Sequence, residues 1–270
     1  MVTYRRPDVL AGTLRRVLEQ TCQPARIVVV DNAADDDVRE SLRSLSPRIT
    51  YLAATENSGF GAGLADGLHS LAGDDLDFFW LLDDDSPPAT NALCEALLIA
   101  NADTSIGVVA NRGGHIRWGR IRHDLGAGAV TVQEEADFAL VDGAVITREA
   151  TRRAGLPRRD LFMMMEDFDY TTRIVDSGLR VVVRPADDSH FGHMGSTGPT
   201  SAWRGYYQSR NLLRIAVDRR KPGWIWGWLV REVGICGHHM FVGNWSSIKL
   251  RLMGAFDGIR NRMGRTVEPH

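Results

Sequence analysis

The protein is a chain of 270 residues with 44% hydrophobic residues and a formal net charge of −2. This length allows one large domain, or one domain and a smaller appendage. The near-neutral charge gives no reason to expect a nucleic-acid partner.

Strand and helix patterns alternate along the first two-thirds of the chain. The α/β order predicts a Rossmann-like, mainly parallel sheet with helices on both faces. Ligands bind such sheets beyond the carboxyl ends of the strands, so Asp31 and Asp83–Asp85, which lie at such ends, should converge there. Strands are predicted at 1–4, 26–31, 49–52, 78–82, 106–110, 138–141, 144–147 and 180–184; helices at 8–20, 35–45, 60–71, 90–100, 148–154 and 166–177; and loops or a small hairpin at 111–135.

Three acids end the most apolar of these strands. Asp83, Asp84 and Asp85 follow five large apolar residues, and two prolines come soon after. Side chains alternate along a strand, so Asp83 and Asp85 should point the same way and Asp84 away. Two same-facing carboxylates suit Mg²⁺ or Mn²⁺. The alternative is a solvated acidic turn.

A glycine-rich loop at 56–63 precedes the third helix. A dinucleotide-binding fingerprint needs the glycines after the first strand and the acid after the second. Here Asp31 follows the second strand, but the glycines follow the third, so that interpretation is rejected. The loop could still bind phosphate or base through backbone N–H groups, or be a plain tight turn.

A second acidic cluster follows another apolar run. Leu161–Met165 leads into Glu166, Asp167 and Asp169, and a helix is expected to start there. Acids are favoured in any first helical turn, which explains one or two of them. Because these acids directly follow a wholly apolar run, we interpret them instead as placing a carboxylate in a pocket. His190 and His193 lie in a later glycine loop, where either could be a third metal ligand.

The C-terminal quarter differs in character. A long helix is predicted at 201–219, followed by Trp224, Trp226 and Trp228 and by a basic segment at 249–265. Arg231 and Glu232 interrupt the apolar residues, so no bilayer span is expected. A helix lying in the membrane interface and a helical pack against the catalytic domain or a dimer partner both remain open. We expect a catalytic domain at 1–200 and a helical region at 201–270.

These motifs together resemble the family-2 inverting glycosyltransferases of GT-A fold, above all bacterial rhamnosyl- and galactofuranosyltransferases of cell-envelope synthesis. The resemblance covers roughly residues 1–215 and extends through a Tyr-Tyr-Gln-x-Arg-Asn motif at 206–211. The family's first strand normally begins several apolar residues earlier, so the chain is expected to start late.

The resemblance implies a role for each candidate residue. Thr3, Tyr4 and Asp31 would contact the base and ribose, with Arg6, Asn57, Gly59 and Asp84 also in the nucleotide site. Asp83 and Asp85 would hold Mn²⁺ or Mg²⁺ on the diphosphate, with His193 as a further ligand. Asp167 would be the base, kept ionised by the helix N-terminus and supported by Glu166 and Asp169, while Asp142 and Gly143 would border the acceptor.

The expected reaction is metal-dependent transfer of a sugar from UDP or dTDP to a glycan or polyprenyl-linked acceptor. One alternative is a sugar-1-phosphate nucleotidyltransferase, which would carry a glycine- and lysine- or arginine-rich loop after its first strand. Arg5–Asp8 contains no glycine. The other alternative is a catalytically silent interaction protein on the same fold.

The cysteines and the N-terminus indicate the compartment. Cys22, Cys94 and Cys236 are far apart and form no Cys-x-x-Cys pair, which is typical of reduced thiols in a cytosol. No signal-peptide pattern opens the chain. We therefore expect a cytoplasmic protein that could work on the inner face of the cell membrane.

Overall fold

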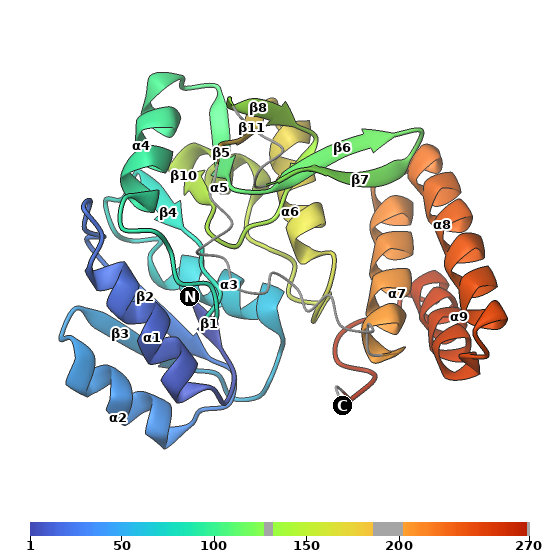
Figure 1. Ribbon diagram of the computed structural model, residues 1–270, viewed down its shortest axis with the longest axis horizontal. Helices are drawn as coiled ribbons and strands as arrows, with labels where there is room; N and C mark the ends of the chain where they lie inside the picture. Colours follow the sequence, from blue (N-terminus) through green and yellow to red (C-terminus); the bar gives the residue numbers. More distant parts are fainter. Residues whose placement is uncertain (127–131, 186–201, 269–270) are drawn as a thin grey trace.

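The computed structural model describes residues 1–126, 132–185 and 202–268. An α/β body is followed by three long helices that stand to one side of it (Figure 1). The predicted α/β class is confirmed. The elements are β1 (Val2–Thr3), α1 (Pro7–Leu18), β2 (Ile27–Asp31), α2 (Asp36–Leu45), β3 (Ile49–Ala53), α3 (Phe60–Ser70), β4 (Phe78–Trp80), α4 (Ala92–Ala102), β5 (Ile106–Ala110), β6 (Gly113–Arg117), β7 (Arg120–Leu125), β8 (Glu134–Ala136), β9 (Phe138–Ala139), β10 (Val145–Thr147), α5 (Arg148–Ala154), α6 (Glu166–Asp176), β11 (Arg180–Val183), α7 (Ala202–Asp218), α8 (Pro222–Phe241) and α9 (Trp245–Ile259).

The main sheet is built in two parts. The first has the parallel order β1-β2-β3, and the second has the order β4-β10-β5-β11-β8. In the second part β5 and β11 are parallel, whereas β10 and β8 run antiparallel to their neighbours. An isolated parallel bridge between Val2 and Asp83 connects the two parts. The carboxyl ends of β1, β2 and β4 therefore meet at one edge.

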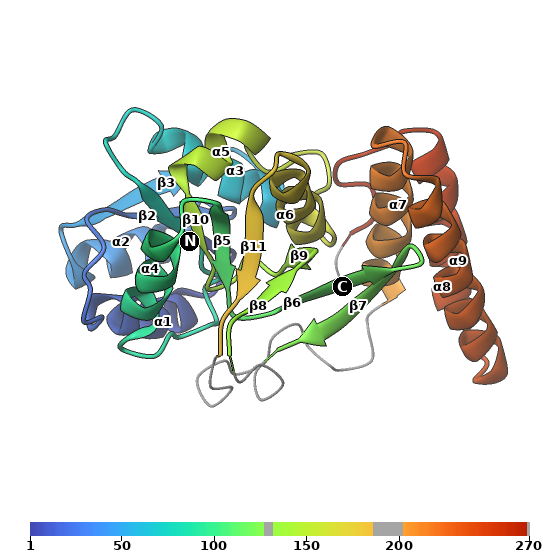
Figure 2. The ribbon, with the colours of Figure 1, turned by 90° about the horizontal axis from the view of Figure 1, so that it is seen from above.

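Helices cover both faces of the sheet because side chains alternate along each strand. Ile27 and Val29 of β2 pack against α1 and α2, and Val109 of β5 packs against α4. Val108 of β5 lies in the opposite cluster, with α3, α5 and α6. Figure 2 shows α1 and α4 on one side of the strands and α3, α5 and α6 on the other.

The C-terminal helices pack closely on one another and on the β6–β7 hairpin. A Cβ atom at Gly254 of α9 would lie 2.3 Å from the carbonyl oxygen of Tyr206 on α7, so only glycine allows this approach. Glu232 of α8 and Arg251 of α9 form a buried bidentate ion pair at 2.7 and 2.8 Å. No helix in the described part of the chain is both long enough and apolar enough to cross a bilayer. The expected domain boundary at residue 200 lies outside the described residues.

Two of the three cysteines form a disulfide bond, so the prediction of reduced thiols is wrong for Cys22 and Cys94. Their 72-residue separation says nothing about distance in the fold, where their Cα atoms lie 5.2 Å apart. The chain after α1 runs beside the approach to α4, and Thr21 N–H donates to the Thr90 carbonyl at 2.8 Å. Because disulfides are rare in the cytosol, the cysteines no longer support a cytoplasmic location.

Candidate active site

The acidic triplet Asp83–Asp85 lies where the carboxyl ends of β1 and β4 meet. Asp84 is fully buried, and its Oδ2 accepts a 2.6 Å hydrogen bond from the hydroxyl group of Thr3 in β1. The carbonyl oxygen of Asp84 accepts another, also of 2.6 Å, from the hydroxyl group of Thr13 in α1. The turn that carries the triplet is therefore fixed by two separate elements.

The prediction that Asp84 points away from its neighbours is wrong. Strand β4 ends at Trp80, and the triplet lies in an irregular turn, where strand alternation no longer applies. One carboxylate oxygen from each of the three acids lies within 4.8 Å of the other two. All three carboxylates therefore face a common centre.

Arg6 places a positive charge on this centre. Its Nη2 lies 2.5 Å from Oδ1 of Asp84, and its Nη1 lies 2.8 Å from Oδ2 of Asp85. Among the predicted nucleotide-binding residues, Tyr4 and Arg6 are open to solvent, whereas Thr3 and Asp84 are buried. The exposed residues could contact a ligand directly, while the buried ones hold the turn.

Asp142 lies directly beside the triplet. Its Oδ1 accepts a 2.8 Å hydrogen bond from the backbone N–H of Asp83. Burial raises the pKa of both carboxyl groups to about 6, with the neighbouring acids adding to the effect. Gly143, with a φ of 76°, turns the chain so that its carbonyl oxygen accepts a 3.2 Å bond from Nε1 of Trp80. The residues predicted to border the acceptor thus adjoin the predicted metal ligands.

Glu166 and Asp167, at the start of α6, complete the acidic site. Burial raises the pKa of Glu166 to about 7, and it raises that of Asp167 well above its usual range, with Glu166, Asp142 and Asp83 adding to the rise. Among the described residues, Oε2 of Glu166 and Oδ1 of Asp167 are buried without a hydrogen-bond partner.

Burial thus shifts the pKa of Asp167 upward, against the lowering expected from the helix N-terminus, and its ionisation at neutral pH stays a prediction. A helix dipole contributes about 0.3–2 kcal/mol. Full burial can move a pKa by about 3–5, and a change of one in a pKa corresponds to about 1.4 kcal/mol. Desolvation is the larger effect, and the adjacent acids act in the same direction.

The segment that delivers Glu166 has an unusual backbone. Phe162, Met164 and Met165 have φ values of 63°, 68° and 72°, a left-handed conformation that is rare outside glycine. The side-chain amide of Asn211 on α7 donates to the carbonyl oxygens of Leu161, Met163 and Met164 at 2.9, 2.8 and 2.7 Å. The left-handed conformation of this segment is thus stabilised by hydrogen bonds from α7.

Arg210 adds to this anchor. Its Nη2 donates to the carbonyl oxygen of Leu161 at 3.0 Å, and its Nε donates to Oδ1 of Asn211 at 2.8 Å. The guanidinium group is fully buried and lies over the Tyr207 ring, 4.7 Å from the centroid. The motif at 206–211 was visible in the sequence, but which carbonyl groups it would hold was not.

Asp169 does not join the acidic site. It is buried and accepts a 2.9 Å bond from Nε of Arg173, one helical turn further along α6. Nη2 of Arg173 reaches the carbonyl oxygen of Leu156 at 2.9 Å, and the same guanidinium contacts that of Ala154. The ion pair therefore connects α6 to the end of α5 and the residues after it. Asp169 supports Asp167 only by stabilising the helix that carries both.

Asp31 and the glycine loop are occupied by protein contacts. Asp31 is fully buried and accepts bonds from the N–H groups of Ala33 and Asp35 and from the Tyr51 hydroxyl, at 2.8, 2.7 and 2.9 Å. Asn57 Oδ1 accepts a 3.1 Å bond from Gly59 N–H.

Gly59 cannot be replaced by another residue without a rearrangement. It has a φ of 92°, and a Cβ atom there would lie 1.8 Å from the carbonyl oxygen of Phe162. A Cβ at Gly61 would lie 2.9 Å from the carbonyl oxygen of Arg158. Close packing against the 158–166 segment accounts for these glycines, and binding of phosphate or base by the loop stays a prediction.

Comparison with known proteins decides the family. The model of the family described as glycosyl transferase family 2 matches residues 1–138, about half of the chain. The chain belongs to glycosyl transferase family 2. It is thus a glycosyltransferase, and the nucleotidyltransferase alternative is not supported.

Curated relatives narrow the likeness. The chain is 28% identical over 288 residues to galactofuranosyltransferase GlfT1 of Mycobacterium tuberculosis, covering 87% of this chain and 93% of that protein. It is 30% identical over 199 residues to GlfT1 of Mycolicibacterium smegmatis, covering 66% of this chain and 65% of that relative. This glycosyltransferase therefore resembles galactofuranosyltransferases at modest identity.

Solved structures support the GT-A fold. The mannosyltransferase PcManGT from Pyrobaculum calidifontis, in complex with GDP-Man and Mn²⁺, matches with a TM-score of 0.61 at 15% identity, covering 97% of this chain and 86% of that one. S. aureus TarS 1–349 matches with a TM-score of 0.60 at 16% identity, covering 97% and 80%. At these identities the likeness concerns the fold alone.

The residues of this glycosyltransferase fit a divalent cation. Three carboxylate oxygens share one centre, and oxygen ligands are those that Mg²⁺ and Mn²⁺ prefer. Asp83 and Asp142 also have pKa values raised by burial among acids, which is the electrostatic condition that a bound cation would relieve. His193 and His190, predicted as a third ligand, lie outside the described residues.

Proposed function

We propose that the protein transfers galactofuranose or rhamnose from a UDP- or dTDP-linked donor to a hydroxyl group of a glycan or lipid-linked glycan, with inversion. The likeness to GlfT1 over most of both chains supports this class of donor and acceptor. The observation that carries the proposal is the convergence of two acidic groups from separate elements, the triplet after β4 and the pair at the start of α6. The product would be a lengthened glycan in cell-envelope or polysaccharide synthesis.

The triplet is the proposed cation and diphosphate site. Asp83 and Asp85 would hold Mn²⁺ or Mg²⁺, Asp84 would keep the turn in place, and His193 would be a further ligand. The Mn²⁺ and GDP-Man present with PcManGT support this assignment. When bound, the ion would neutralise charge on the departing nucleoside diphosphate. The exposed guanidinium group of Arg6, which pairs with Asp85, would contact the same diphosphate.

Asp167 is the proposed base. Its carboxylate would accept the proton of the acceptor hydroxyl while that oxygen bonds to the anomeric carbon and the bond to the diphosphate breaks. Inversion requires attack from the face opposite the leaving group, and the two acidic groups come from different elements, as this requires. Asp142 interacts with both acidic groups: its charge raises the pKa of Asp167, and the charge of Asp83 raises the pKa of Asp142.

A thermal-shift panel with UDP-, dTDP- and GDP-sugars, each with Mn²⁺, Mg²⁺ or EDTA, tests the donor and the cation. A ligand at 100 times its dissociation constant stabilises by about 2.7 kcal/mol, which such a scan resolves. We expect a shift with one diphosphate sugar that disappears in EDTA. Asp85→Asn should weaken metal-dependent binding and leave binding of the bare nucleoside nearly unchanged. Equal shifts with and without EDTA would contradict the cation site.

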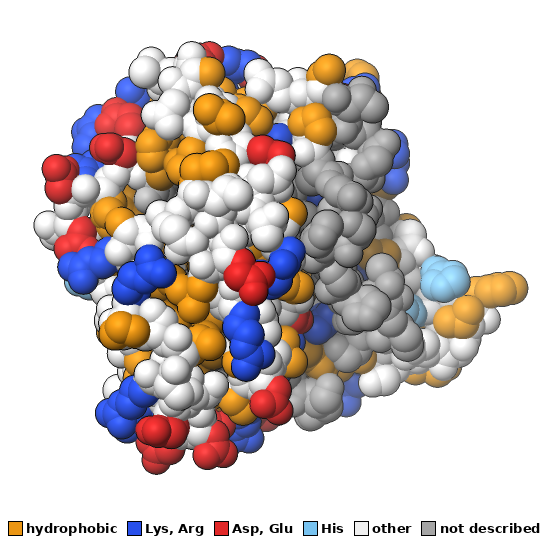
Figure 3. All heavy atoms as spheres, turned by 60° about the vertical axis from the view of Figure 1, so that its left-hand side comes forward, with side chains coloured by type: hydrophobic (Ala, Val, Ile, Leu, Met, Phe, Trp, Pro, Cys, Tyr) orange, Lys and Arg blue, Asp and Glu red, His pale blue; other side chains and the backbone are white. Residues whose placement is uncertain are grey.

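We also propose that helices α8 and α9 bring the enzyme to a membrane that holds a polyprenyl-linked acceptor. The two helices expose many large apolar side chains, and Figure 3 shows apolar atoms beside a histidine at the far end of the helical region. Phe241 is 91% exposed. The larger exposed members of this apolar face are Trp226, Leu229, Val233, Met240, Phe241, Trp245, Leu252, Phe256 and Ile259.

The three tryptophans that suggested this contact from the sequence differ in their surroundings in the structure. Trp224 packs on Phe168, with ring centroids 4.9 Å apart, and Nε1 of Trp228 donates to the carbonyl oxygen of Ser209 at 3.0 Å. Only Trp226 of the three is exposed. Trp224 and Trp228 therefore pack inside the protein, which agrees with the alternative that the helical region packs against the catalytic domain.

The charges on this surface favour an anionic bilayer over a second copy of the chain. The acids of α8 and α9, Glu232 and Asp257, are buried. Lys249, at the apolar face, and Arg260 and Arg262, after α9, are exposed. A symmetric dimer through this face would bring like charges together, whereas anionic lipid would complement them.

Sedimentation with anionic liposomes tests the membrane contact. Binding should weaken with salt, and it should fall strongly when Trp226, Phe241 and Trp245 are all changed to Ser. Leu98→Ser is the matched control, because Leu98 is 72% exposed on α4, outside the apolar face. A concentration-dependent dimer that the triple variant abolishes, together with no liposome binding at low salt, would favour the dimer instead.

A further inference from the structure

The tip of the β6–β7 hairpin carries a tryptophan in an unfavourable position. Arg117 and Arg120 pair directly, so the turn between them consists of Trp118 and Gly119. Both turn residues have positive φ values, 53° and 73°, as in a type I′ turn, which favours Asn-Gly. This backbone conformation is unusual for a bulky residue, and Trp118 is 91% exposed. Packing within the protein therefore gives no reason for a tryptophan at this position.

The charges at the hairpin tip are also unfavourable without a partner. Arg117 and Arg120 are exposed and lie opposite each other, where like charges repel. Neither of them forms an ion pair with an acid in the described part of the chain. Arg122, two residues further along β7, is exposed as well. An anionic partner would relieve this repulsion, whereas a second copy of the tip would add to it.

Glycines hold the hairpin tip against the start of α8 (Figure 1). A Cβ atom at Gly119 would lie 1.7 Å from the carbonyl oxygen of Gly223, and one at Gly227 would lie 1.9 Å from that of Gly119. Behind the tip, Ile116 and Ile121 pack in the apolar cluster that also contains the inner side of α8. The tip therefore has a fixed position relative to this helix.

The exposed apolar residues of α8 lie between the hairpin tip and α9. Residues three or four apart share a helix face, so Trp226, Leu229 and Val233 form one stripe, and all three are exposed. Gly227, which contacts the tip, follows a stripe residue by one position, whereas Glu232, which bonds to α9, precedes one. Successive residues turn in the same sense around a helix, so these two contacts lie on opposite flanks of the stripe.

We propose that the hairpin tip is a further contact with an anionic membrane surface, and that α8 lies along this surface between the tip and α9. The inference rests on the membrane contact proposed above for α8 and α9. Indole rings favour the boundary between headgroups and hydrocarbon, and guanidinium groups bind lipid phosphate, so Trp118 and its flanking arginines suit that boundary. An end-on orientation, with only the corner around Phe241 and Trp245 in the bilayer, would leave the stripe and the tip in water.

Trp118→Asn tests the inference because it separates stability from membrane binding. The turn becomes Asn-Gly, the preferred pair for this turn type, so the Tm should stay the same or rise. Affinity for phosphatidylglycerol liposomes at low salt should nevertheless fall by about tenfold. Arg117→Gln with Arg120→Gln should weaken binding by at least about tenfold and lessen its dependence on salt. Arg15→Gln with Arg43→Gln, at exposed positions on α1 and α2, is the matched control.

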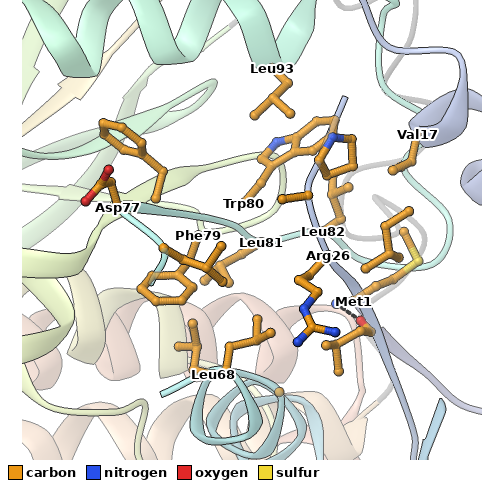
Figure 4. Close-up of a pocket in the computed structure, with 18 of the residues that line it drawn as sticks. Met1, Val17, Arg26, Leu68, Asp77, Phe79, Trp80, Leu81, Leu82 and Leu93 are labelled. Carbon is orange, nitrogen blue, oxygen red and sulfur yellow. Dashed lines mark hydrogen bonds between the residues drawn. The ribbon is translucent and has the colours of Figure 1, made fainter. Parts of the chain in front are cut away.

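An apolar cavity elsewhere in the protein requires a separate control. It has a volume of about 380 Å³ and lies between β2 and β4, where Leu68 and Leu93 line its walls (Figure 4). A free acyl chain could enter it, but the cavity belongs to the α/β body, away from the hairpin tip. Binding there would respond neither to headgroup charge nor to a change at Trp118, so neutral phosphatidylcholine liposomes serve as the control.

The outcomes separate this inference from the membrane contact itself. If Trp118→Asn and the Arg117/Arg120 double variant bind liposomes as the wild type does, while the triple variant described above does not, the end-on orientation holds and only this inference is overturned. A wild-type chain that binds no liposomes at low salt overturns both. A lower Tm for Trp118→Asn would show that the tryptophan stabilises the hairpin instead. A dimer without lipid that this change abolishes would assign the tip to a second copy of the chain.

Discussion

The two acidic groups of the site are held in different ways. In the triplet, Asp84 is fully buried but bonded by Thr3 and Arg6, and Asp85 is paired with the same arginine. At the start of α6, Glu166 and Asp167 each keep a buried oxygen without a partner among the described residues. The protein itself therefore compensates Asp84 and Asp85, whereas Asp83, whose pKa burial raises to about 6, and the second group are held at an energetic cost.

The difference follows from what anchors each group. Arg6 brings a full positive charge to the triplet from the loop after β1. The segment before α6 is fixed by the neutral amide of Asn211, which binds backbone carbonyl groups and leaves the carboxylates of Glu166 and Asp167 uncompensated. A scaffold that fixes position without supplying charge leaves an acid ready to exchange a proton.

The largest effect is expected when Asp167 becomes Asn. This change keeps the shape and removes the basicity, so turnover should fall by about 10²–10⁴-fold while donor affinity survives. The Tm near pH 7.5 should rise, because a buried carboxyl group with a raised pKa is removed. Turnover, donor affinity and Tm are measured on the same preparation.

Asp169→Asn is the matched control for that variant. Asp169 is paired with Arg173, so its loss should lower the unfolding free energy by about 1–3 kcal/mol and leave turnover within a few-fold. If Asp167→Asn behaved in the same way, Asp167 would be structural and Asp142 would be examined as the base. If donor affinity collapsed as well, Asp167 would belong to the cation site.

Asn211→Ala should remove the anchor of the left-handed segment. Three carbonyl groups lose their donor, so we expect a loss of about 2–4 kcal/mol in unfolding free energy. Because Asp167 is then less well placed, kcat should fall more than donor affinity. Gln208 lies on α7, as Asn211 does, and contacts Arg231 of α8 at 2.9 Å. Gln208→Ala is therefore the control, and it should leave kcat near wild type. A fall in donor affinity alone would argue against the anchor.

The sequence predicted the elements and the two acidic groups well because both follow from local patterns. An apolar run gave β5, and the breakers Gly155 and Pro157 gave the end of α5, with the bounds observed at 106–110 and 148–154. The acids were found because they end such runs. The rule that parallel strands present ligands at their carboxyl ends predicted convergence only for Asp31 and the triplet, not for the triplet and the acids at the start of α6.

What the sequence could not give depends on contacts between distant segments. The turn that gathers the triplet is set by Thr3 and Thr13, some 80 and 70 residues earlier, through bonds that no local pattern encodes. The Cys22–Cys94 bond and the raised pKa of Asp167 likewise depend on which neighbours the fold supplies. Strand alternation failed at Asp84 because β4 ends before the triplet begins.

Arg6→Met should make the triplet resemble the second group. Without the guanidinium group, Asp84 and Asp85 lose their positive partner, and we expect a loss of about 1–2 kcal/mol in unfolding free energy in EDTA. Mn²⁺ alone should then bind more tightly, on the order of tenfold, because a competing cation is gone. Calorimetric titration of Mn²⁺ without nucleotide checks this, with Arg5→Met as control. Weaker Mn²⁺ binding by Arg6→Met would show that Arg6 orders the ligands instead of competing for them.

The smallest expected effect is a pH dependence of stability that reports the uncompensated acids. The pKa values of Asp83 and Asp142 are raised to about 6 and that of Glu166 to about 7, from ordinary values of 3.8 and 4.5. The folded protein therefore binds more protons than the unfolded chain between those values. The contribution of these groups to the unfolding free energy must fall as the pH rises through about 4.5 to 7.

Urea unfolding in EDTA at several pH values between about 5 and 8 measures this slope. A carboxyl group whose pKa is higher by one in the folded protein than in the unfolded chain contributes about 1.4 kcal/mol, so the loss over the range should be resolvable. Glu166→Gln removes one of the raised groups and should flatten the curve, whereas Glu149→Gln, at an exposed acid whose arginine partners lower its pKa to about 2, should not. Mn²⁺ should stabilise the protein more near pH 8 than near pH 5, because the carboxylates that bind it are then free of protons. If Glu166→Gln left the slope unchanged, its carboxyl group would be compensated in solution, and the contrast between the two acidic groups would be lost.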